Sequence, residues 1–125
     1  MTGKERQVAW PRLKVGVTRE EAYGLLTMKR GICSEDLNSL LQPGKHYSAT
    51  TASGERFTGT VEFVCAGRGF CLTVREMKDA LLWLTIEGVP GNIEVQAWLS
   101  AFGLPGTSVD TFHKTWESRL KQLFV

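Results

Sequence analysis

Two residue types in this chain could carry nucleophilic chemistry near neutral pH, namely cysteine and histidine. Cys33 directly precedes an expected helix cap, and a helix N-terminus can lower the pKa of a thiol. His46 or His113 would have to complete a Cys–His pair with it. The apolar neighbours Ile32 and Leu37 indicate instead that Cys33 packs inside the protein, and no surrounding motif supports a nucleophile.

Metal, phosphate and acyl-transfer motifs are missing from the sequence. It contains no C-x-x-C or H-x-x-x-H spacing, no Walker loop, no G-x-G-x-x-G fingerprint and no G-x-S-x-G. Gly67-Arg68-Gly69 needs only the geometry of a hairpin turn to explain it. We therefore predict no metal, no cofactor and no catalytic residue, and we expect neither an enzyme nor a small-molecule substrate.

Basic residues gather at the N-terminal end of a chain whose net charge is only +2 over 125 residues. Interleaved with an aromatic ring, such residues suit a phosphate backbone or an anionic lipid surface. The alternative is a solvated arm whose charge aids solubility. The candidate contact residues are Lys4, Arg6, Trp10, Arg12, Lys14 and Arg19.

Four tryptophans are spread along the chain, and tryptophan is enriched at interfaces. Trp116 falls on the apolar stripe of an expected helix, which predicts a core position. Trp83 and Trp98 lie off the apolar stripes of their segments, so both are candidates for an oligomer or partner contact. The alternative for these two is a second core layer.

Hydrophobic periodicity and capping signals divide the chain into short elements. The pair Thr18 and Glu21 predicts a capping box for the first helix, and Ser34 is the expected cap of the second. Alternating residues predict a three-stranded meander. The expected elements of this first half are a strand over 12–17, a helix over 19–30, a short helix from 34, and strands over 45–52, 57–65 and 70–74.

A longer helix is predicted over 74–87, because Thr73 and Glu76 form a second capping box and apolar residues recur at helical spacing. Residues 93–102 alternate like a strand, although 94–102 could form a helix; we favour a strand that passes into one helical turn. The last helix is expected over 109–124.

These elements predict an α+β fold. Its small antiparallel sheet, of about three to five strands, would pack with two long and one or two short helices. Residues 1–11 are expected to form a basic N-terminal arm, and residues 12–125 a single compact domain.

Membrane and secretory signals are not seen. No apolar run approaches the roughly 18–20 residues that span a bilayer, and the N-terminus has no apolar signal core. Three cysteines, an odd number, suit reduced thiols. We expect a protein of the host cytoplasm or a virion interior, neither secreted nor transmembrane.

Residues 59–103 resemble the core of rhabdovirus matrix proteins. The shared order is a strand at 60–64, a tight turn, the segment Thr73-Val74-Arg75-Glu76, an apolar helix through Trp83, a Gly/Pro loop at 88–91 and an apolar segment to Gly103. The resemblance implies a non-enzymatic viral protein that self-associates, binds membrane through its basic end and condenses a nucleocapsid. The sequence lacks the P-P-x-Y and P-[ST]-A-P motifs of that family.

The sequence thus predicts a self-associating, matrix-like viral protein that binds an anionic surface and protein partners. Two alternatives stay open. One is a small RNA-binding viral accessory protein that uses the basic end, with a tryptophan stacking on bases. The other is a compact inhibitor or adaptor that binds one protein partner through an apolar patch near Trp83 and Trp98.

Overall fold

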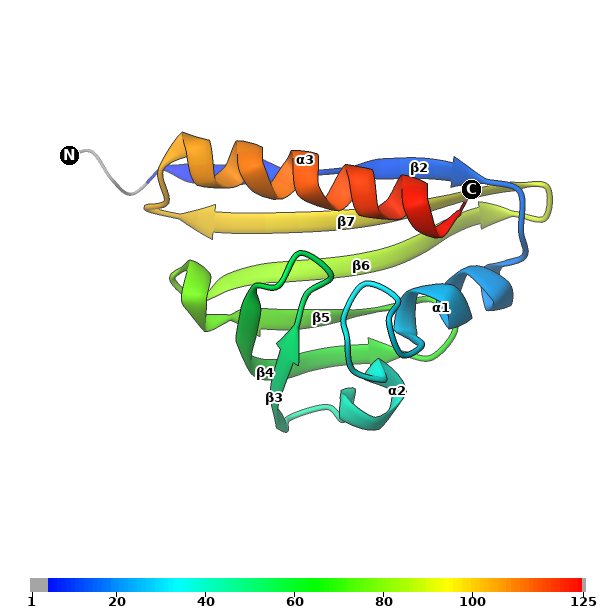
Figure 1. Ribbon diagram of the computed structural model, residues 1–125, viewed down its shortest axis with the longest axis horizontal. Helices are drawn as coiled ribbons and strands as arrows, with labels where there is room; N and C mark the ends of the chain where they lie inside the picture. Colours follow the sequence, from blue (N-terminus) through cyan, green and yellow to red (C-terminus); the bar gives the residue numbers. More distant parts are fainter. Residues whose placement is uncertain (1–4, 125) are drawn as a thin grey trace.

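An antiparallel sheet of seven strands carries its helices on one face (Figure 1). A computed structural model describes residues 5–124. The elements in chain order are β1 (Arg6–Ala9), β2 (Arg12–Val15), α1 (Arg19–Thr27), α2 (Leu37–Leu40), β3 (His46–Thr50), β4 (Arg56–Cys65), β5 (Gly69–Val74), the 3-10 turn η1 (Arg75–Met77), β6 (Ala80–Val89), β7 (Asn92–Phe102) and α3 (Gly106–Leu123).

The strand order is β1-β7-β6-β5-β4-β3, and β2 pairs with β7 beyond the end of β1. Trp10 and Pro11 separate β1 from β2, and the Ala97 N–H donates to the Pro11 carbonyl at 2.9 Å. Residues 6–9 were expected in an arm, but they pair with β7 from Arg6 opposite Phe102 to Ala9 opposite Leu99. The α+β class is confirmed, whereas the expected sheet of three to five strands is too small.

We call the face that α3 covers the inner face of the sheet and the opposite one the outer face. Side chains alternate between them because successive residues of a strand point to opposite sides. On β7, for example, Val95, Ala97 and Leu99 are buried on the inner face. The stripe Val109, Phe112, Trp116 and Leu120 buries α3 against it, and Figure 1 shows this helix running along β7 and β2.

Several predicted elements are confirmed with shifted ends. The Thr18 hydroxyl accepts from the Glu21 N–H at 3.1 Å, so the first capping box is present, and α1 ends at Thr27. The short second helix is capped by Asp36 and not by Ser34. The meander β3-β4-β5 is present. The last helix begins at Gly106, three residues before the predicted start.

The helix predicted over 74–87 is wrong. Its N-terminal residues form only the single turn η1, and Lys78 and Asp79 then adopt left-handed backbone angles, with φ of 56° and 58°. From Ala80 the chain is β6, which pairs with β5 as far as Thr85 and with β7 from Leu81 to Val89. Residues 92–102 are strand throughout, so the favoured strand is confirmed and the final helical turn is not.

Candidate ligand-binding site

A groove opens beside the first turns of α3, where the helix faces η1 and the turn between β3 and β4. We call this hollow of about 330 Å³ the α3 groove. Three apolar residues line it, namely Met77, Leu104 and Phe112, and five polar residues do so as well, namely Glu55, Glu76, Thr107, Ser108 and Thr111. Concave sites that combine apolar surface with polar groups are where small molecules bind.

Glu76 holds a fixed carboxylate at this groove. The Thr58 N–H donates to its Oε1 at 2.8 Å, and the Thr58 hydroxyl donates to its Oε2 at 2.5 Å. Burial by itself would raise the pKa of Glu76, but these hydrogen bonds outweigh it and hold the pKa below its ordinary value. The groove therefore carries a negative charge at neutral pH.

Aromatic rings fill the space between the middle of α3 and the β3–β4 hairpin, a line of contact that we call the seam. Trp116 stacks on Phe112 with ring centroids 4.9 Å apart and lies nearly parallel to Phe57 at 6.4 Å. A hollow of only about 10 Å³ lies beside them, between Trp116 and Thr51.

Arg119 closes the far end of the same seam. Its guanidinium donates to the Arg30 carbonyl at 2.7 Å and to the Gly31 carbonyl at 2.7 and 3.0 Å. Beside it lies a second opening of about 300 Å³, which Cys33 and Ser34 also line. Burial raises the pKa of the Cys33 thiol to about 12, so this thiol stays protonated at neutral pH.

Tyr47 is the buried phenol of the inner face. Its hydroxyl donates to the Thr73 carbonyl at 2.8 Å, and burial raises its pKa above the ordinary value. The group is therefore neutral and already hydrogen-bonded. Among residues 5–124, no three or more His, Cys, Asp or Glu side chains gather so that they could hold a metal ion.

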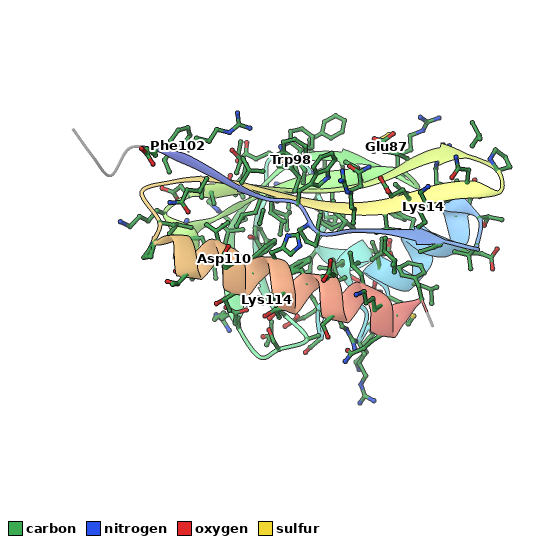
Figure 2. All side chains as sticks on the ribbon, turned by 90° about the horizontal axis from the view of Figure 1, so that it is seen from above. Lys14, Glu87, Trp98, Phe102, Asp110 and Lys114 are labelled. Atoms are coloured by element: carbon green, nitrogen blue, oxygen red, sulfur yellow. The ribbon has the colours of Figure 1, made fainter. Side chains whose placement is uncertain are left out.

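The tryptophans proposed as contact residues, Trp10, Trp83 and Trp98, lie elsewhere, on the outer face. Trp10 and Trp98 pack with centroids 4.9 Å apart, and the Arg12 guanidinium lies 4.1 Å from the Trp10 ring centroid. Trp83 is 38% exposed, and its ring centroid lies 6.0 Å from that of Phe63. In Figure 2, Phe102, Trp98 and Glu87 stand on the side of the sheet away from Asp110 and Lys114 of α3.

Arg6, Arg12 and Lys14 share this outer face with the tryptophans, because they alternate along β1 and β2 with inward residues. Arg19 lies apart from them at the start of α1, where it donates to the Gly88 carbonyl at 2.6 Å. A separate hollow of about 300 Å³ lies there, between α1 and the β6–β7 turn. Lys4 lies outside the described residues. Binding of RNA or of an anionic surface by this set stays a prediction.

Sequence reasoning missed the α3 groove. Glu76 and Met77 had been placed in a helix that does not form, and their closeness to α3 depends on sheet topology. One signal was available: Thr107, Thr111 and Thr115 recur every four residues beside the apolar stripe of the last helix. Because threonine side chains are short, a row of them next to the buried stripe leaves space between that side of the helix and the elements it faces.

Comparison with solved structures shows which proteins share this fold. No family model matches the sequence, and the search of curated proteins gave no match. Among solved structures, a protein from Staphylococcus saprophyticus is similar with a TM-score of 0.71 at 15% identity, covering 95% of this chain and 90% of that one. The Aha1 dimer from Colwellia psychrerythraea gives 0.68 at 12%, covering 94% and 93%.

A Polyketide_cyc-like protein from Corynebacterium glutamicum gives a TM-score of 0.61 at 9% identity, covering 96% of this chain and 90% of that one. This chain has the fold of these bacterial proteins. At such identities the likeness concerns the fold alone. The chain also covers 46% of DynU16, a putative protein of the dynemicin biosynthetic locus, with a TM-score of 0.71 at 16% identity.

The resemblance to rhabdovirus matrix proteins is therefore wrong, and so is the matrix-like viral function it implied. The resemblance depended on a tryptophan-bearing helix around Trp83, and that segment is the strand β6. The similar structures named above are bacterial, so a virion or host-cell setting has no support. No helix within residues 5–124 is long and apolar enough to cross a membrane.

Proposed function

We propose that the protein binds a small organic molecule with both apolar and polar surface in the α3 groove. The observation that carries this proposal is the groove itself, with apolar walls of Met77, Leu104 and Phe112 beside the fixed Glu76 carboxylate. The likeness to a Polyketide_cyc-like protein supports it, because the groove lies against the long C-terminal helix of that shared fold. This proposal replaces the expectation that no small molecule binds.

The negative charge of the groove limits which ligands should bind there. Glu55 and Glu76 both line it, and no lysine, arginine or histidine is among its lining residues. A ligand with a positive charge or a hydrogen-bond donor should be favoured over an anionic one, since unlike charges attract and like charges repel. We therefore propose a ligand that has an apolar part and also carries such a group.

We propose binding and not nucleophilic catalysis. Tyr47 has a raised pKa and already donates its hydroxyl proton to the Thr73 carbonyl. The Cys33 thiol, with its pKa near 12, lies at the far end of the seam, past Arg119. A nucleophile needs a lowered pKa or an adjacent base, and neither residue has one in its hydrogen bonds.

The test uses three dyes as probes: Nile red, which is neutral, thioflavin T, which is cationic, and 1-anilinonaphthalene-8-sulfonate, which is anionic. Fluorescence titration should show tighter binding of the first two than of the third. Thr111→Trp should fill the groove and weaken that binding at least about tenfold. Asp110→Trp, one residue away on the outward side of α3, is the matched control and should leave it unchanged.

Either of two results would contradict the proposal. The first is dye binding that Thr111→Trp leaves intact. The second is a preference for the anionic dye that Glu76→Gln does not alter. Because dyes could also settle on the exposed tryptophans, the titrations are repeated in Trp83→Ser, which should retain the binding that Thr111→Trp removes.

A further inference from the structure

The loop between α1 and α2 contains a left-handed residue that is not glycine. Arg30 has a φ of 64°, a region in which the Cβ of an L residue lies too close to the following carbonyl oxygen. Glycine or asparagine adopts this conformation at lower cost. Strained residues of this kind cluster at functional sites, so the side chain of Arg30 calls for a role that a glycine could not fill.

The backbone of this loop is fixed from two sides. On the α3 side, Arg119 donates from Nε to the Gly31 carbonyl at 3.0 Å and from Nη2 to the Arg30 carbonyl at 2.7 Å. On the sheet side, the Ser34 N–H donates to the Thr50 carbonyl at 2.8 Å. The point from which the Arg30 side chain leaves the loop is therefore set by the fold.

A hollow of about 300 Å³ lies between this loop and α3, and we call it the arginine hollow. Its lining residues are Arg30, Gly31, Cys33, Ser34, Ala52 and Arg119. Two of them carry a positive charge, and among the described residues no aspartate or glutamate lines the hollow. Cys33 adds no negative charge at neutral pH, because burial raises the pKa of its thiol to about 12.

Two acids close to the hollow in sequence are engaged elsewhere. Glu35 accepts the Thr50 N–H at 2.8 Å through its Oε1. Glu117 pairs on its own helix with Lys121, at 3.8 Å between Oε1 and Nζ. Within residues 5–124, neither arginine of the hollow forms an ion pair. The positive charge of the hollow is therefore not neutralised by the part of the chain that the structure describes.

We propose that the arginine hollow binds an oxyanion, namely the phosphate or carboxylate group of a small molecule. A guanidinium presents its donors in a planar fork that matches two oxygens of such a group. Among residues 5–124 the guanidinium of Arg30 has no hydrogen-bond partner, so its fork can close on the anion. Arg119, whose donors already hold the loop, adds a fixed positive charge. The site is separate from the negatively charged α3 groove, so neither proposal depends on the other.

A chemical-shift titration of the whole nitrogen-labelled chain with inorganic phosphate tests the proposal, with sodium chloride keeping the ionic strength constant. The amides of Gly31 and Ser34 should shift and saturate, with a dissociation constant on the order of 1 mM. The same titration with acetate distinguishes the two sources of the anion, because the group that the hollow takes should bind more tightly. Shifts that saturate with neither phosphate nor acetate would overturn the proposal.

Two neighbouring cations provide a matched pair of variants. Arg30→Gln should weaken phosphate binding at least about tenfold, because it removes the charged fork. Lys29→Gln removes the same charge from an exposed residue that does not line the hollow, and it should change binding less than about threefold. Equal weakening in the two variants would show only a general attraction of anions to the loop and would overturn the proposal.

Arg30→Gly separates binding from support of the fold. Glycine removes the side chain and tolerates the left-handed backbone, so phosphate binding should be lost while the midpoint of thermal denaturation stays unchanged or rises. Loss of binding together with a fall of more than about 5 °C in the midpoint would mean that Arg30 supports the fold, and this would overturn the proposal.

The anionic dye used to test the α3 groove carries a sulfonate, which is an oxyanion of the same kind. Its titration is therefore repeated in Arg30→Gln, in which the arginine hollow should no longer bind. Binding of the anionic dye that disappears in Arg30→Gln, and that phosphate displaces in the parent chain, supports the arginine hollow and does not count against the α3 groove.

Discussion

The rings of Phe57 and Trp116 lie nearly parallel, with an interplanar angle of 12° and centroids 6.4 Å apart. This contact joins the start of β4 to the middle of α3, two elements far apart in the chain. Phe57 is 4% and Trp116 5% exposed, so both rings lie in the core. The pair holds the β3–β4 hairpin against the helix and so shapes the α3 groove.

Phe57→Ala should therefore lower the free energy of unfolding by about 3–5 kcal/mol, the usual loss when a large buried ring is truncated. Phe102→Ala removes the same side chain at a position that is 55% exposed, and it should cost less than about 1.5 kcal/mol. Urea denaturation checks both values. Equal losses in the two variants would mean that the Phe57 contact contributes no more than an exposed ring.

Two glycines should respond to alanine in opposite directions. A Cβ at Gly59 would lie 1.9 Å from the Thr73 carbonyl oxygen, which also accepts the Tyr47 hydroxyl bond. Gly59→Ala should therefore destabilise the fold by more than about 2 kcal/mol. Gly24 lies inside α1 with open space around it, so Gly24→Ala should stabilise by up to about 1 kcal/mol. Thermal denaturation checks both predictions: the midpoint temperature should fall in Gly59→Ala and rise in Gly24→Ala.

Stability should depend on pH through Glu76. Its pKa is lowered in the folded protein, so its contribution is present above the unfolded pKa and is lost as the pH falls through the folded one. The stability difference between the parent chain and Glu76→Gln should thus shrink between about pH 6 and about pH 3. Thr58→Val, which removes the hydroxyl donor, should flatten this dependence. A difference that is constant with pH would show that Thr58 does not hold the carboxylate.

The cysteines should differ in reactivity. Burial raises the pKa of Cys33 to about 12 and that of Cys71 to about 11. At pH 8 their thiolate fractions are then on the order of 10⁻⁴ and 10⁻³. A disulfide reagent should label the half-buried Cys65 first, and Cys65→Ser should remove that fast phase. Rapid labelling of Cys33 in the folded chain would argue against its burial.

Local patterns in the sequence predict helices and strands well where one face of the element is apolar. The Thr18–Glu21 box and the stripe through Phe112 and Trp116 are examples, and the helices they predict are present. Such patterns depend on neighbours a few residues apart, which the sequence shows directly. The alternation of apolar and polar residues along β7 predicted a strand for the same reason.

Prediction failed at β6 because both of its faces carry apolar residues. Leu82, Leu84 and Ile86 point inward, and Leu81 and Trp83 point outward. This hides the two-residue period of a strand behind a spacing that also fits a helix. The capping-box pattern of Thr73 and Glu76 was misleading as well, since Glu76 binds Thr58 from another strand. The α3 groove needed this topology and could not be predicted from local patterns.

The break at Trp10 and Pro11 has a consequence for how chains can meet. A sheet edge is a template on which another chain can add a strand, and repeated addition leads to fibres. Here the edge beside β7 is two four-residue strands. Pro11 interrupts them, and Arg6, Arg12 and Lys14 bring like charge along the edge. The edge is therefore a poor template for open-ended growth by the addition of strands.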